Sequence, residues 1–140
     1  MEKEFTPYQE ALELKELGFD ETCFGYYVDG ELRGINLGME ELGGVEPYYQ
    51  RLGFHTLSNH DIDNPNKIVA TAPTYSQAFR WFRDVYNLKS CIMFRTSMED
   101  NKEYYDWLIK GQEVVYRHFN TYEEAELACL QKLIEIVKTK

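Results

Sequence analysis

The chain has 140 residues, a length that suits one compact domain. Hydrophobic residues make up 44% of it and aromatic residues 15%, so the chain can bury a core, and this excludes a globally disordered protein. The net charge of −9 disfavours binding to the phosphates of a nucleic acid.

The acidity is confined to the N-terminal third. Residues 1–46 contain 12 Asp and Glu against three Lys and Arg, whereas residues 47–140 contain 12 of each. The acidic end either keeps the protein soluble or meets a basic partner. We expect neither a signal peptide nor a membrane span, because no stretch has the required apolar length. A cytoplasmic protein is therefore predicted.

Residues 1–36 are predicted to form an acidic helix followed by a hairpin. The helix covers residues 6–17, with Thr6 as its N-cap, Pro7 at its first position and Gly18 after its end.

The predicted hairpin joins Thr22–Val28 to Glu31–Asn36 through Asp29 and Gly30. Asp-Gly is a type I′ turn signal, and both flanks are rich in residues that favour strands. Gly25 indicates either a bulge or a close approach of another segment.

Residues 37–71 are predicted to be a long irregular loop. Either Glu46–Leu52 forms a short helix within it, or the segment is a functional loop. Its end, Ile68–Thr71, is expected to form a short strand.

The clearest helix follows at Ala72–Leu88, with Thr74 as its N-cap. Helical periodicity places six apolar residues on one face: Tyr75, Ala78, Phe79, Phe82, Val85 and Tyr86. Trp81 lies at the border of that face, and Arg80 and Arg83 lie opposite it. We expect either an ordinary amphipathic helix or a patch in which Trp81 stacks on bases and the two arginines contact phosphates.

Three strands and a helix are predicted after that. The strands are Lys89–Ser97, Glu103–Lys110 and Glu113–Phe119, and short turns favour their antiparallel pairing. The final helix is Tyr122–Val137, capped by Thr121.

This final helix has a second apolar flank formed by Leu127, Leu130 and Ile134. The flank is expected to pack on the N-terminal hairpin or to form a homodimer. The predicted fold class is therefore α+β, a single domain with segments 1–36, 37–71 and 72–140. The last segment is an α-β-β-β-α unit, in which two helices pack on a three-stranded antiparallel sheet.

The order of elements in the C-terminal half is similar to that of a double-stranded RNA-binding domain. In that family the second helix begins with a lysine cluster, whereas this chain has Glu123, Glu124 and Glu126 there. Three acids would repel a phosphate backbone, which argues against RNA binding.

A second resemblance covers more of the chain. The segments TPYQEALELKELGFD (6–20), APTYSQAFRWFRDVYNL (72–88) and TYEEAELACLQKLIEIVK (121–138) resemble those of small uncharacterised phage- and prophage-type proteins. The resemblance implies an accessory protein of a phage or mobile element in the cytoplasm of a bacterial host. It carries over no catalytic residues.

The loop HTLSNHDID holds the one grouping with metal-ligating chemistry. His55, His60, Asp61 and Asp63 are close enough in sequence to bind a divalent cation, although the pattern is also typical of a solvated loop. Cys23, Cys91 and Cys129 lack metal-type spacing and are expected to be buried, reduced thiols. No nucleophile elbow or phosphate-binding glycine loop is present, and no cofactor is expected.

The sequence therefore favours a non-catalytic module that binds a protein partner, with at least one exposed aromatic residue among Trp81, Tyr104, Tyr105 and Trp107. One alternative is a nucleic-acid-binding module that uses four cations with Trp81: Arg80, Arg83, Lys89 and Arg95. The other is a metal-dependent enzyme that uses the His55–Asp63 loop.

Overall fold

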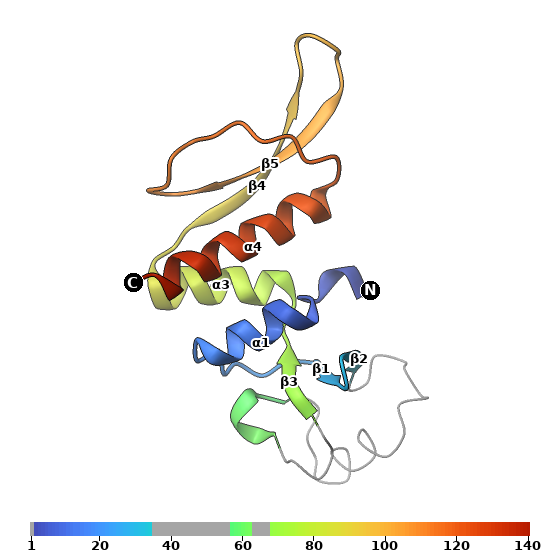
Figure 1. The fold of residues 1–140 in the computed structure, drawn as a ribbon, viewed down its shortest axis with the longest axis vertical. Helices are drawn as coiled ribbons and strands as arrows, with labels where there is room; N and C mark the ends of the chain where they lie inside the picture. Colours follow the sequence, from blue (N-terminus) through green and yellow to red (C-terminus); the bar gives the residue numbers. More distant parts are fainter. Residues whose placement is uncertain (1, 35–56, 63–67) are drawn as a thin grey trace. The chain divides into compact units, whose positions relative to one another are not determined.

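The computed structural model describes residues 2–34, 57–62 and 68–140 (Figure 1). Within these residues the fold is α+β, with three α-helices, a three-stranded antiparallel sheet and a separate β-hairpin. The chain divides into two compact units, Met1–Thr74 and Tyr75–Lys140, which are described one at a time. The helix considered at Glu46–Leu52 lies outside the described residues.

In the first unit, helix α1 covers Tyr8–Glu16 and ends as predicted. Gly18 follows it with a φ of 97°, a left-handed conformation that favours glycine. The Phe19 N–H donates to the Leu14 carbonyl at 2.9 Å, which closes a Schellman motif.

The start of α1 differs from the prediction. Pro7 is the N-cap, and the helix has no side-chain cap. Thr6 is fully buried instead, and its N–H donates to the Pro73 carbonyl at 2.9 Å. This hydrogen bond ties the chain before α1 to Pro73, which is distant in the sequence, and α1 begins one residue later than predicted from Thr6.

The sheet consists of β1 (Gly25–Val28), β2 (Glu31–Gly34) and β3 (Ile68–Ala72) in the order β2-β1-β3. Asp29 and Gly30 both have positive φ, 52° and 78°, as a type I′ turn requires. Both the predicted hairpin and the predicted strand at Ile68–Thr71 are confirmed.

Gly25 is the point of closest approach in this sheet. A Cβ atom built there would lie 2.9 Å from the Phe5 ring and 3.2 Å from the Ala72 carbonyl oxygen. The close approach expected from the sequence is confirmed. The core of this unit includes two apolar clusters, Phe5–Ala11–Tyr27–Ala72 and Tyr26–Leu57–Ile68.

The second unit contains α3 (Tyr75–Tyr86), β4 (Ser90–Thr96), β5 (Glu103–Ile109) and α4 (Tyr122–Lys138). The Thr121 Oγ1 accepts the N–H of Glu124 at 3.1 Å, so the predicted cap of the last helix is confirmed. The turn end of the β4–β5 hairpin extends beyond α4 (Figure 1).

The third strand predicted at Glu113–Phe119 does not form. This segment makes a single bridge, in which Tyr105 and Phe119 exchange two hydrogen bonds of 2.9 and 3.0 Å. The next ladder position is blocked because the Asp106 carboxylate accepts the N–H groups of both Trp107 and Arg117, at 2.7 and 3.2 Å. The β-structure of the C-terminal unit is thus a two-stranded hairpin with an irregular flanking segment.

The two apolar flanks of α4 are used within this unit. The helix contacts β4, β5 and also α3. Leu130 and Ile134 are buried and Leu127 is half-buried. A homodimer through these three residues, one of the two alternatives drawn from the sequence, would therefore have to displace packing that α4 already makes.

Candidate functional site

The candidate site is the β4–β5 hairpin together with the flanking segment, residues 111–119. β4 and β5 pair without interruption from Ser90↔Ile109 to Thr96↔Glu103. Asn101 adopts a φ of 57° in the connecting turn, and the Asp100 carboxylate accepts the Tyr104 hydroxyl at 2.7 Å. This bond lowers the pKa of Asp100 and raises the pKa of Tyr104. The turn is therefore held by its own side chains.

A buried carboxylate joins the flanking segment to the hairpin. Asp106 is fully buried, and its oxygens lie 3.3 Å from Arg117 Nη1 and 3.6 Å from Arg95 Nη2. Two backbone N–H groups bind the same carboxylate, as described above. A buried charge needs such pairing, so these contacts fix the position of the flanking segment.

Stacked side chains extend this attachment. The Arg95 guanidinium lies 4.4 Å from the centre of the Tyr116 ring, and that of Arg117 lies 3.6 Å from the Trp107 ring. The His118 ring stacks on Tyr104 with 4.5 Å between centroids. Cation–π contacts of this kind hold rings in defined orientations.

The flanking segment nevertheless exposes three consecutive apolar side chains. Val114 is 58% exposed, Val115 45% and Tyr116 72%. An exposed run of three or more apolar residues is unusual on a soluble domain unless it serves a function. The segment therefore presents apolar groups to solvent from an anchored backbone.

The start of α4 places acids beside an aromatic residue. Tyr122 is 45% exposed and lies 6.1 Å from the Tyr105 ring. Partial burial and the neighbouring Glu123 raise the pKa of Glu126 to about 7. Glu126 thus titrates near neutral pH.

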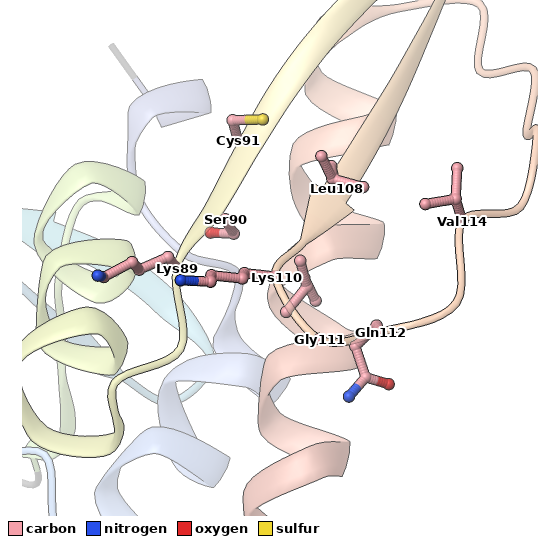
Figure 2. A pocket seen from close by; sticks show the side chains of 9 residues that line it. Lys89, Ser90, Cys91, Leu108, Lys110, Gly111, Gln112 and Val114 are labelled. Atoms are coloured by element: carbon pink, nitrogen blue, oxygen red, sulfur yellow. The ribbon is translucent and has the colours of Figure 1, made fainter.

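A pocket of about 390 Å³ opens at the root of the hairpin (Figure 2). Its walls include Cys91, Leu108 and Val114, while the side chains of Lys89 and Lys110 both extend away from Val114. Binding sites for small molecules usually have polar groups that converge on the ligand. The two ammonium groups do not converge in this way, so the pocket does not define a catalytic site.

The cysteines lie in two different environments. Cys23 and Cys129 are buried as expected, and burial raises the pKa of each thiol to about 12. Cys91 is exposed, contrary to the prediction. The two buried thiols stay protonated at neutral pH and are poor nucleophiles.

The aromatic residues singled out from the sequence are mostly covered. Trp81 and Trp107 are each 7% exposed, and Tyr104 and Tyr105 are half-buried. The Trp81 ring packs 5.1 Å from Phe82 and 5.2 Å from Tyr86, so the core face of α3 is rotated towards it.

Val85, which was placed on the core face of α3, is 57% exposed as a result of this rotation. The same rotation leaves Trp81 unavailable for stacking on a base.

The four cations of the nucleic-acid alternative do not act as a group of free charges. Arg95 is held by Asp106, and Arg83 lies 3.7 Å from Asp84. Arg80 and Lys89 are exposed. Paired arginines contribute less positive potential to a phosphate-binding surface.

The proposed metal loop is described only in part. His55 and Asp63 lie outside the described residues, and Asp61 is described only as the last residue of a short 3-10 helix, Asn59–Asp61. His60 Nδ1 lies 2.7 Å from the Asp20 carboxylate, a contact that lowers the pKa of Asp20. The described part of the chain holds no group of three or more His, Cys, Asp or Glu side chains suited to a metal ion.

The residues that organise the site were not selected from the sequence. The site depends on contacts between strands and the flanking segment: Asp106 of β5 binds Arg117, and Arg95 of β4 stacks on Tyr116. One signal was available, since Asp106 interrupts the apolar and aromatic run Tyr104–Ile109. A charged residue in such a strand requires a buried partner or a solvent-facing position.

Comparison of the chain with protein-family models, curated proteins and solved structures found no match. Among the described residues, none of the helices has the length and apolar character needed to cross a membrane.

Proposed function

We propose that the chain is a non-catalytic module that binds a partner protein through the exposed run Val114–Tyr116. In keeping with the resemblance of its helical segments, the partner would be a protein of a bacterial host in which a phage-type accessory protein acts. The alternatives based on nucleic acid or metal gain no support from the site.

A single observation carries this proposal. Val114, Val115 and Tyr116 are exposed, although Asp106 binds the backbone N–H of Arg117 next to them and Arg95 stacks on the Tyr116 ring. A rigid apolar surface loses little conformational entropy when it binds, which favours association. Tyr is also among the residues enriched in protein interfaces.

The test is affinity capture from a bacterial lysate with quantitative mass spectrometry. The double variant Val114→Ser/Tyr116→Ser removes apolar area at the proposed surface. Val85→Ser is a matched control, because Val85 is 57% exposed on α3. We expect the wild type and Val85→Ser to retain the same protein and the double variant to lose it. Equal retention by all three proteins would contradict the proposal.

A further inference from the structure

The outer edge of β4 presents backbone groups that point away from β5. The Lys110 N–H donates to the Lys89 carbonyl, and the Ser97 N–H donates to the Lys102 carbonyl, both at 2.9 Å. Hydrogen-bonded pairs alternate along an antiparallel ladder, so the backbone N–H and C=O groups of the odd-numbered residues of β4 point towards β5. The N–H and C=O groups of the even-numbered residues, Ser90, Ile92, Phe94 and Thr96, therefore face outward.

No residue in the described part of the chain pairs with the backbone of these four residues. β4 also lacks the features that usually block an open edge. It contains no proline and its register has no bulge. Its one charged residue, Arg95, is held by Asp106. The edge is thus seven residues long, regular and accessible to another strand.

We infer that a second copy of the chain pairs with this edge, β4 against β4, in antiparallel orientation. The two-fold axis would pass beside Met93 and join the two hairpins into one four-stranded sheet. The hairpin already packs against α4, and pairing with a second copy would give partners to the outward N–H and C=O groups of β4. The inference is independent of the proposed partner protein, because the Val114–Tyr116 run belongs to the segment that flanks β5.

The sequence of β4 is complementary to itself in this register. Ile92 lies opposite Phe94 of the second copy, and the symmetry repeats this pair, so two apolar aromatic contacts form on one face. Phe94 is 67% exposed in the single chain and would gain cover. Ser90 lies opposite Thr96 at both ends of the paired strands.

Charge also permits self-association here. Residues 75–140 contain ten acids and ten bases, so the unit that carries β4 has no net charge to repel its copy. Arg95 lies opposite Cys91 of the second copy in this register, and no like charges are directly opposed. An extended segment of another protein is the other conceivable occupant, but the sequence of β4 is complementary to itself in this register, which favours a second copy.

The first test compares molar mass by light scattering over a dilution series for three proteins. Ile92→Pro removes an outward N–H without touching the β4–β5 ladder, whereas Ile92→Ala keeps that N–H. We expect the wild type to be dimeric at high concentration, Ile92→Ala to dimerise more weakly and Ile92→Pro to be monomeric. A wild type that stays monomeric, or a dimer that survives in Ile92→Pro, would overturn the inference.

A second test reads the register and does not depend on whether Ile92→Pro folds. Opposed Met93 residues would have Cα atoms about 4.5 Å apart, which suits a disulfide. The two copies of Cys91 would be roughly 13 Å apart along the strand. We expect Cys91→Ser/Met93→Cys to form a covalent dimer rapidly under copper-phenanthroline and the wild type to form it slowly. The reverse order, or no covalent dimer in either protein, would contradict the register.

Discussion

The outer edges of β3 and β4 both present backbone N–H and C=O groups that no neighbouring strand in the described part of the chain binds, but only β3 binds some of them with side chains. At β3, the Thr71 N–H donates to the Asn59 side chain at 2.9 Å, and the Val69 carbonyl accepts a hydrogen bond from Lys15 Nζ at 2.7 Å. At β4, no described residue supplies such a bond. In the first unit side chains therefore close the β3 edge of the sheet, whereas in the second unit the β4 edge has no partner among the described residues.

The difference separates a structural role from a binding role. Asn59 also donates to the Phe19 carbonyl at 2.7 Å, so the residue that closes β3 ties three segments together. In the second unit the side-chain contacts lie instead on the β5 side of the hairpin, where Asp106 and Arg117 hold the segment that flanks β5. An open edge next to an anchored one is an arrangement suited to strand addition.

We expect the largest loss of stability when the contacts that hold the flanking segment to β5 are removed. Asp106→Ala leaves Arg95 and Arg117 without their carboxylate, and removing one partner of a buried ion pair costs about 3–5 kcal/mol. Urea denaturation should show this loss in the free energy of unfolding. The control Asp84→Ala disrupts only an exposed pair and should change that energy by less than about 0.5 kcal/mol. A loss of stability in Asp106→Ala no larger than in the control would contradict the buried network.

The next effect opens the closed edge of β3. Asn59→Ala removes the partners of the Thr71 N–H and the Phe19 carbonyl, and at about 1 kcal/mol for each hydrogen bond we expect a loss of about 2 kcal/mol. The amide of Thr71 should also exchange faster with deuterated solvent. Gln9→Ala, at an exposed position of α1, is the control and should change neither quantity. Unchanged exchange at Thr71 would show that Asn59 does not close this edge.

A smaller effect depends on pH and concerns the start of α4. Because the pKa of Glu126 is about 7 in the folded chain, above its ordinary value of 4.5, the folded state holds this proton more tightly than the unfolded state. The contribution of Glu126 to stability is thus fully present below pH 4.5 and is lost as the pH rises through 7.

Glu126→Gln should remove this part of the pH dependence. At pH 8 the variant should be more stable than the wild type by at most about 1 kcal/mol, since solvent screens this half-exposed group. Denaturation at pH 5 and pH 8 measures the difference, with the exposed Glu113→Gln as control. Equal pH profiles for the wild type and Glu126→Gln would contradict the assigned burial.

We expect the smallest loss of stability when the hydrogen bond to the Val69 carbonyl at the β3 edge is removed. Lys15→Met removes the donor to Val69 but keeps most of the aliphatic stem. The bond is exposed, so we expect a loss of about 0.5 kcal/mol, measured by thermal unfolding. A loss as large as that of Asn59→Ala would mean that the lysine, and not the asparagine, is the main closure of β3.

The elements with local signals could be predicted from the sequence. Asp29-Gly30 sets its own turn, Gly18 ends α1, and Thr121 caps α4, because each depends on residues within one turn of the chain. Thr6 does not cap α1, and its N–H donates to the carbonyl of Pro73, a residue 67 positions away along the chain. Local patterns carry no information about such a contact.

The candidate site was predicted less well for the same reason. The third strand has a suitable composition, but a side chain of the neighbouring strand, Asp106, occupies its ladder. Trp81 looked half-exposed by periodicity, yet its contacts with Phe82 and Tyr86 rotate the buried face of α3. The open edge of β4 could not be predicted, since it follows from which strands fail to find a neighbour.

The most direct test of the contrast between the two edges is amide hydrogen exchange in dilute solution, residue by residue. We expect the amides of Ile92 and Phe94 to exchange rapidly, whereas those of Met93, whose N–H faces β5, and Thr71, whose N–H is bound by Asn59, should be protected. On concentration, Ile92 and Phe94 should become protected as β4 pairs with its copy. Equal protection of Ile92, Met93 and Phe94 at high dilution would contradict the open edge.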